Sequence, residues 1–203
     1  IYSRISNPTI QAFEEKISLL EGGVSSVAVS SGQSANMLAV LNICKSGDSI
    51  LCSSKVYGGT FNLLGPSLKK FGIDLISFDL DSSEDEIVEL AKENTKVVFA
   101  ETLANPTLEV IDFEKIANVA KRINVAFIVD NSLASPVLCN PLKYGANIVT
   151  HSTTKYLDGH ASSVGGIIVD GGNFNWDNGK FPELVEPDPT YHGISYTQKF
   201  GNA

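Results

Sequence analysis

The sequence predicts an α/β fold in which a mostly parallel β-sheet is covered by helices on both faces. Short apolar runs alternate with longer stretches in which apolar residues recur every three or four positions, as expected for parallel strands joined by helices. Residues 125–129, Val-Ala-Phe-Ile-Val, form the most continuous apolar run, which is typical of a strand buried on both faces. The sequence contains no internal repeat or low-complexity tract that would indicate another architecture.

The first predicted helix follows a polar, irregular arm at residues 1–9. Asn7 is a favourable N-cap and Pro8 a favourable first helical residue, so we expect the helix to begin there. Its apolar residues are spaced three and four apart, and Gly22-Gly23 is expected to end it. The face predicted to be buried consists of Ile10, Phe13, Ile17 and Leu20.

The remaining elements alternate along the chain. Strands are predicted at residues 27–29, 50–52, 73–78, 97–100, 125–129, 147–151 and 164–169. Helices are predicted at residues 35–44, 60–71, 82–92 and 112–122. One irregular region, residues 171–193, is rich in Gly, Asn and Pro. A loop of this length is usually functional, part of an oligomer contact, or mobile.

The composition is that of a globular protein and argues against several other classes. A length of 203 residues, with 43% hydrophobic and 19% charged residues, suits one large domain. A net charge of −8 without a polybasic run argues against nucleic-acid or membrane-surface partners, and no apolar run reaches the roughly 20 residues of a membrane helix. Three scattered cysteines predict reduced thiols in the cytoplasm, with no metal site. Because the chain begins with Ile1, we expect it to be a piece of a longer polypeptide.

Lys155 follows the predicted strand 147–151 in a turn rich in hydroxyl groups. In an open α/β sheet, ligands bind beyond the carboxyl ends of the strands. A lysine amine at that position could form an imine with a carbonyl cofactor, or it could simply be a surface lysine. Ser152 and Thr154 flank it, and their hydroxyls could bind a phosphate or the local backbone.

Ser31, Gly32 and Gln33 lie between the predicted strand 27–29 and the helix that follows it. Backbone N–H groups at a helix N-terminus attract anions, and a glycine lets a phosphate approach closely. The alternative is a plain turn with a serine cap. The Gly-x-x-x-x-Gly-Lys spacing of a Walker loop is absent, and no Gly-x-Gly-x-x-Gly follows a predicted strand, which argues against a dinucleotide site.

Asp130 ends an apolar strand, where a carboxylate needs a cation or a hydrogen-bond donor. It could pair with a protonated ring nitrogen, or it could serve as a helix cap or in a structural salt bridge.

Tyr57 precedes Gly58-Gly59 at another strand end. Its ring could either cover a planar cofactor or merely pack against the protein. Asn105 follows strand 97–100 similarly. An amine, a carboxylate, a helix N-terminus, hydroxyls and an aromatic ring at one sheet edge are the groups that pyridoxal phosphate needs.

The same residues carry a resemblance to the Cys/Met-metabolism pyridoxal-phosphate enzymes. It extends in order through essentially the whole chain. The matching motifs are Tyr2-Ser3-Arg4, Asn7-Pro8-Thr9, Ser30-Ser31-Gly32-Gln33, Tyr57-Gly58-Gly59-Thr60, Glu101-Thr102 with Asn105-Pro106, Val129-Asp130-Asn131 and Ser152-Thr153-Thr154-Lys155-Tyr156.

The resemblance implies the large domain of a fold-type-I enzyme, similar to aspartate aminotransferase, over residues 10–203. It implies catalytic roles for Lys155, which binds the cofactor covalently, and for Tyr57, which stacks on its ring. It also implies that residues 1–9 form an arm reaching a neighbouring subunit of a homodimer or homotetramer with shared active sites. The other implied cofactor-binding residues are Ser31, Gly32, Gln33, Asn105, Asp130, Ser152 and Thr154, with Tyr2 and Arg4 acting on the neighbouring subunit.

Within the family, Ser31-Gly32-Gln33, Thr153 and the segment 170–193 resemble the O-acetylhomoserine sulfhydrylases. These replace the acetyl group of O-acetylhomoserine with sulfide or a small thiol, giving homocysteine or methionine and acetate. The alternatives are a methionine γ-lyase, a cystathionine γ-synthase or lyase, and a non-catalytic truncated subunit. The family's C-terminal small domain, which carries the arginine for the substrate carboxylate, is absent from this chain. Departures from the family pattern are Ser132, where threonine is usual, and Ala161-Ser162.

Overall fold

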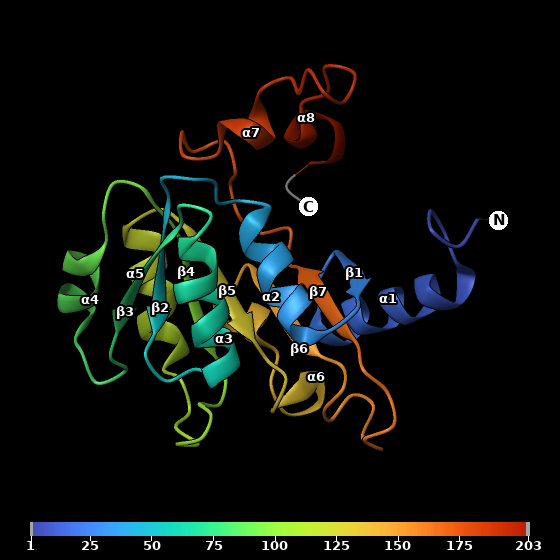
Figure 1. Cartoon of the computed structure of the whole chain (residues 1–203), viewed down its shortest axis with the longest axis horizontal. Helices are drawn as coiled ribbons and strands as arrows, with labels where there is room; N and C mark the ends of the chain where they lie inside the picture. The colour runs from blue at the N-terminus through green and yellow to red at the C-terminus, as the bar shows by residue number, and fades with distance from the viewer. Residues whose placement is uncertain (1, 202–203) are drawn as a thin grey trace.

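The computed structural model describes residues 2–201 and contains a seven-stranded sheet in the order β1-β7-β6-β5-β4-β2-β3 (Figure 1). Only β7 runs antiparallel to its neighbours, and the remaining strand pairs are parallel. The predicted mostly parallel sheet is therefore confirmed. The strands are β1 (Ser25–Val29), β2 (Ser49–Ser53), β3 (Asp74–Phe78), β4 (Thr95–Glu101), β5 (Ala126–Asp130), β6 (Ile148–Ser152) and β7 (Gly166–Asp170).

Helices cover both faces of the sheet, and each face has its own apolar core. One core contains Ile17, Ile87 and Ile116, which come from α1 (Pro8–Glu21), α4 (Glu84–Leu90) and α5 (Phe113–Arg122). The other contains Val40 and Leu64. They come from α2 (Gly32–Leu41) and from η1 (Leu63–Ser67), a π-helical turn that continues α3 (Gly58–Asn62). Strands β4 and β5 are buried along their whole length because both faces are covered.

Helix α1 begins and ends where the sequence predicts. The Asn7 side chain accepts hydrogen bonds from the N–H groups of Thr9 and Ile10, and Gly22 ends the helix in the left-handed conformation at φ +79°. The prediction of which residues form the buried face is confirmed only in part. Ile17 is buried and Phe13 half-buried, whereas Ile10 and Leu20 are 46% and 45% exposed.

Helix α4 is shorter than the predicted 82–92, and two further helices differ from their predicted bounds for local reasons. Helix α2 begins at Gly32, earlier than predicted, because the Ser31 hydroxyl accepts the N–H of Ser34 at 3.1 Å and so caps the first turn. The helix predicted at residues 60–71 is divided into α3 and η1. Pro66 lies inside η1 and lacks the N–H that a regular α-helical turn would use.

The first part of the segment 171–193 is packed onto the sheet. Phe174, Trp176 and Phe181 form edge-to-face pairs, with ring centroids 4.7 Å apart for the first two and 5.1 Å for the last two. The Lys180 ammonium donates to the carbonyl oxygens of Thr95 and Ile123 at 3.3 and 2.9 Å. The sequence did not predict four short helices, α6 (Ser135–Leu138), η2 (Pro141–Tyr144), α7 (Pro182–Val185) and α8 (Tyr196–Phe200).

The helices between residues 2 and 201 are all too short or too polar to cross a membrane.

Candidate active site

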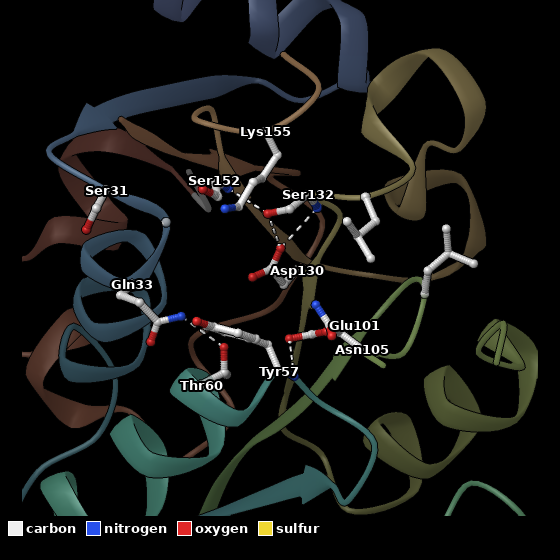
Figure 2. A pocket seen from close by; sticks show the side chains of 13 residues that line it. Ser31, Gln33, Tyr57, Thr60, Glu101, Asn105, Asp130, Ser132, Ser152 and Lys155 are labelled. Carbon is white, nitrogen blue, oxygen red and sulfur yellow. Dashed lines mark hydrogen bonds between the residues drawn. The ribbon is translucent and has the colours of Figure 1, made fainter. Parts of the chain in front are cut away.

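A cavity of about 270 Å³ opens at the carboxyl ends of β4, β5 and β6, between the N-termini of α2 and α3 (Figure 2). All but three of the site residues predicted from the sequence line it, and the exceptions are Thr154, Tyr2 and Arg4. The residues lining the cavity are Ser31, Gly32, Gln33, Tyr57, Thr60, Glu101, Leu103, Asn105, Asp130, Ser132, Leu133, Ser152 and Lys155.

Asp130, the last residue of β5, lies on the cavity floor and is 9% exposed. Its carboxylate accepts three hydrogen bonds, from Asn36 Nδ2 at 3.0 Å, Ser132 N at 3.0 Å and Ser132 Oγ at 2.6 Å. The Asn36 amide is itself oriented by the Thr150 hydroxyl, which donates to Asn36 Oδ1 at 2.5 Å. Asp130 is therefore a fixed acceptor that remains open to a cationic ligand in the cavity.

The N-terminus of α2 forms the opposite wall of the cavity. A Cβ atom on Gly32 would lie 2.5 Å from Ser152 Cβ, so only glycine lets the helix approach β6 this closely. Among the hydrogen bonds of the described chain, none uses the backbone N–H of Gly32 or Gln33, because both residues are in the first turn of α2. The Gln33 side chain donates to Thr60 Oγ1. Two free N–H groups at a helix N-terminus beside a serine hydroxyl are suited to binding a phosphate.

Lys155 lies in the turn that follows β6. Its backbone N–H donates to Ser152 O at 3.2 Å, and its carbonyl accepts the N–H of Gly159 at 2.8 Å, so both ends of the turn are fixed. Figure 2 shows the side chain pointing into the cavity on the side of Ser152 and Ser132. No salt bridge between residues 2 and 201 uses the Lys155 amine, which leaves it available for covalent chemistry.

Tyr57 and Asn105 lie on the walls of the cavity, and the Tyr57 ring is 51% exposed. The ring lies over the first turn of α3, because a Cβ atom on Gly59 would lie 2.5 Å from Tyr57 Cε1. The backbone N–H of Tyr57 donates to Glu101 Oε1 at 2.9 Å. Burial, together with the negative charge of Asp130, raises the pKa of Glu101 to about 8. The sequence indicated no site role for Glu101 beyond its location after an apolar strand.

Thr154, Tyr2 and Arg4 lie outside the cavity. The Thr154 hydroxyl donates to Gly165 O at 3.3 Å and accepts the N–H of Gly165 at 3.1 Å, so it links the lysine turn to the start of β7. Tyr2 and Arg4 lie on the exposed arm before α1, where the Arg4 guanidinium is 5.1 Å from the centre of the Tyr2 ring. The structure thus does not bring these three side chains to the cavity of their own chain.

A second polar cluster lies behind the cavity, on the α1 side of the sheet. His151 Nε2 is 2.6 Å from Glu21 Oε1, and the same oxygen accepts Asn131 Nδ2 at 2.9 Å. Asn131 follows Asp130 and His151 precedes Ser152. Consecutive residues of a strand point to opposite faces of the sheet. The two clusters therefore lie on opposite faces, although neighbouring residues of the same chain segments form them. No motif or periodicity in the sequence relates His151 to Glu21.

The polar groups around the cavity fit pyridoxal phosphate. The free N–H groups of Gly32 and Gln33 suit its phosphate, Asp130 suits a protonated ring nitrogen, and Lys155 suits its aldehyde. The Tyr57 ring provides a flat surface at the mouth. No group of three or more His, Cys, Asp or Glu side chains in the described part of the chain could hold a metal ion.

Comparisons with known proteins agree with this chemistry. The chain is 48% identical to O-acetyl-L-homoserine sulfhydrylase of Leptospira meyeri, covering 99% of this chain and 45% of that protein. It is 45% identical to homocysteine/cysteine synthase of Saccharomyces cerevisiae, covering 100% of this chain and 46% of that protein. The chain therefore spans about half the length of the curated relatives it matches.

The structure superposes on that of a Campylobacter jejuni protein described as an O-acetylhomoserine (thiol)-lyase, which contains N'-pyridoxyl-lysine-5'-monophosphate. The TM-score is 0.93 at 36% identity, covering 98% of this chain and 50% of that one. The fold is therefore that of pyridoxal-phosphate enzymes, as predicted. The family model for Cys/Met metabolism PLP-dependent enzymes matches residues 1–185. The chain belongs to the Cys/Met metabolism PLP-dependent enzyme family.

Proposed function

We propose that this chain is the cofactor-binding part of a sulfhydrylase. The enzyme would convert O-acetylhomoserine and sulfide, or a small thiol, to homocysteine, or methionine, and acetate. The observation that carries the proposal is the similarity to sulfhydrylases and homocysteine synthases over 99–100% of this chain, which includes the segment 171–193. The geometry of the cavity supports it, because a lysine amine, an acidic residue and a phosphate-binding helix terminus meet there.

Each cofactor-binding group has a proposed role in the cavity. When bound, pyridoxal phosphate supplies an electron sink for the carbons next to the substrate amine. Asp130 would hold the proton on the ring nitrogen, and Asn105 would contact the ring hydroxyl. The phosphate would be bound by Ser31, Gly32, Gln33 and Ser152, and by Thr154 after a local rearrangement.

Lys155 and Tyr57 are the proposed catalytic residues. The Lys155 amine would attach the cofactor and, once displaced by the substrate amine, move protons at Cα and Cβ of the substrate. The covalently modified lysine in the Campylobacter jejuni structure supports the first role. The Tyr57 ring, at the cavity mouth, would cover the cofactor and exclude water from one side.

We also propose that the active sites are shared between subunits of a homodimer or homotetramer. Tyr2 is 60% exposed on the arm before α1 and does not line the cavity of its own chain. Figure 1 shows this arm at the end of α1 that is farther from the sheet. Helix α6 follows β5 directly and exposes Val137 and Leu138, 80% and 79% accessible, at the same sheet edge as the cavity. Such an exposed apolar surface is typical of a subunit interface. Arg4 would then reach the phosphate of the neighbouring subunit.

The proposed enzyme has further parts and a cytoplasmic location. Residues 1–9 would form the arm and residues 10–203 the cofactor-binding domain, with a smaller C-terminal domain outside this chain. That domain would provide the arginine for the substrate carboxylate, in keeping with the length of the relatives. The buried thiols of Cys44 and Cys52 support a reducing compartment, the cytoplasm.

The test is an assay of the full-length protein with two substrate sets. Formation of homocysteine from O-acetylhomoserine and sulfide supports the proposal. Release of ammonia and 2-oxobutyrate from methionine without sulfide would indicate a γ-lyase instead. A full-length protein that shows no visible absorption band with excess pyridoxal phosphate would be a non-catalytic subunit.

A further inference from the structure

Glu101 is a buried acidic residue that lines the cavity. The proposed function assigns it no role. It is the last residue of β4, is 8% exposed, and lines the cavity. In the sheet it lies directly opposite Asp130, and neighbouring strands are about 4.8 Å apart. The strand register therefore brings two carboxyl groups together at the bottom of one pocket (Figure 2).

The two carboxyl groups have different surroundings. Asp130 accepts three hydrogen bonds, from Asn36 and twice from Ser132. Glu101 interacts with the N–H of Tyr57 and the hydroxyl of Thr60, and these donors do not outweigh its burial beside Asp130. When two adjacent buried carboxyl groups cannot both ionise easily, the one with fewer donors keeps the proton.

We propose that Glu101 is a positioning residue that carries a proton beside charged Asp130 and fixes the Tyr57 ring over the cavity. Tyr57 is the N-cap residue of α3, and its own side chain makes no capping hydrogen bond. Its N–H bond to Glu101 Oε1 links the start of α3 to the end of β4. A neutral Glu101 also leaves Asp130 as the single negative charge on the cavity floor. The inference rests on the proposed cofactor site.

The titratable groups around Glu101 come from four elements. Asp130 lies on β5, Tyr57 at the start of α3, Lys155 beyond β6 and Cys52 on β2. Burial raises the pKa of the Cys52 thiol, so that Cys52 is neutral. Asp130 is the charged neighbour that raises the pKa of Glu101.

The protonation of Glu101 is tested by thermal unfolding of the full-length protein, cofactor-free, from pH 5 to pH 9. The pKa of Glu101 is higher in the folded protein than in the unfolded chain, so the unfolded chain binds fewer protons between these values. Wild-type stability therefore falls as the pH rises from about 5 to about 8, relative to E101Q. The Tm advantage of E101Q should grow by a few degrees over this window and level off above it. An advantage that is constant with pH would overturn the proposal.

Comparing the pH dependence of Tm for D130N and for the double variant D130N/E101Q tests whether Asp130 raises the pKa of Glu101. Without the neighbouring charge, the pKa of Glu101 lies closer to its ordinary value, so the pH-dependent advantage of E101Q should shrink. An unchanged advantage would show that Asp130 does not determine the charge of Glu101.

Positioning of Tyr57 is tested by the affinity for pyridoxal phosphate, measured from its absorbance. E101Q keeps an oxygen that accepts the Tyr57 N–H and should bind within threefold of wild type, whereas E101A should bind about tenfold more weakly. Equal losses in both variants would contradict the positioning role. None of these measurements requires turnover. A protein without sulfhydrylase activity would refute the proposed function and leave the Glu101 test intact.

Discussion

Nε2 of His151 lies 2.6 Å from Oε1 of Glu21, although 130 residues separate them and both side chains are fully buried. The pair connects the end of α1 to β6, the strand that leads to Lys155. Asn131 Nδ2 donates to the same Glu21 oxygen, and the Thr102 hydroxyl donates to Asn131 Oδ1 at 2.7 Å. Hydrogen bonds therefore hold the ends of β4, β5 and β6 together from behind, on the face opposite the cavity.

Replacement of Glu21 with alanine is expected to destabilise the protein strongly. The change removes the acceptor of buried His151 Nε2 and one of the two acceptors of Asn131 Nδ2, which also donates to Cys139 O, and it costs about 3 kcal/mol. Urea unfolding of the full-length protein measures this loss. Glu15→Ala is the matched control, because Glu15 lies on the same helix, is exposed, and accepts a hydrogen bond from exposed Gln11. The control should cost about 0.5 kcal/mol or less. Equal losses would show that the buried cluster contributes little to stability.

The element pattern could be predicted from sequence because it depends on local signals. The strands at residues 97–100 and 125–129 are apolar throughout and are buried on both faces, as β4 and β5. The caps at Asn7 and Gly22 depend on residues within one helical turn, and both were predicted. The division of residues 60–71 into α3 and η1 was missed because a proline inside a helical pattern can end, bend or distort the helix.

The cavity was predictable to the extent that its groups lie at strand ends. Asp130, Lys155 and Gly32 follow apolar runs, and parallel strands bring such positions to one edge of the sheet. The residues that support them could not be found this way. Asn36 is 94 residues from Asp130, and neither its spacing nor its neighbours in sequence indicate that it would donate to that carboxylate. Glu101 likewise lies beside Asp130 because of the strand register, and burial together with that neighbouring charge raises its pKa to about 8.

Replacement of Lys155 with alanine should abolish covalent attachment of the cofactor without unfolding the protein. The side chain is exposed and makes no salt bridge within residues 2–201, so its loss should change stability by less than about 0.5 kcal/mol. The measurement is reduction of the loaded protein with borohydride, followed by peptide mass analysis. The peptide with residue 155 should carry the cofactor in wild type and in the control Lys70→Ala, which alters an exposed lysine before β3. Cofactor on another lysine would contradict the assignment.

Replacement of Gly32 with alanine should weaken cofactor binding and folding together. The new Cβ would meet Ser152 Cβ at 2.5 Å and Ser152 Cα at 2.8 Å, so α2 must move away from β6. Forced shifts of this kind cost about 1–3 kcal/mol, and the N–H groups of the helix end would move with the backbone. Gly58→Ala is the control, since a Cβ there would contact nothing within 4 Å. Thermal unfolding and cofactor titration should separate the two variants. Similar behaviour of both would show that the close approach of α2 to β6 is not required.

Co-expression of two inactive full-length variants tests whether Arg4 acts on the neighbouring subunit. One variant carries Arg4→Ala and the other Lys155→Ala. In a symmetric dimer with shared sites, a mixed pair combines the intact Arg4 of one chain with the intact Lys155 of the other at one of its two sites. Activity should therefore return to on the order of a quarter of the wild-type level when the chains pair at random.

Each variant expressed alone gives the baseline activity. The control for simple mixing combines the two separately purified variants under conditions in which their subunits do not exchange. Arg122→Ala replaces Arg4→Ala in a parallel co-expression. Arg122 bonds to Glu84 and Asp85 on the surface of the same chain and lies outside the cavity lining, so that variant should remain active by itself. If Arg4 instead served its own chain, no mixed pair would contain a complete site, and the co-expressed variants would stay at the baseline. The exposure of Arg4 and Tyr2, and their absence from the cavity of their own chain, favour recovery.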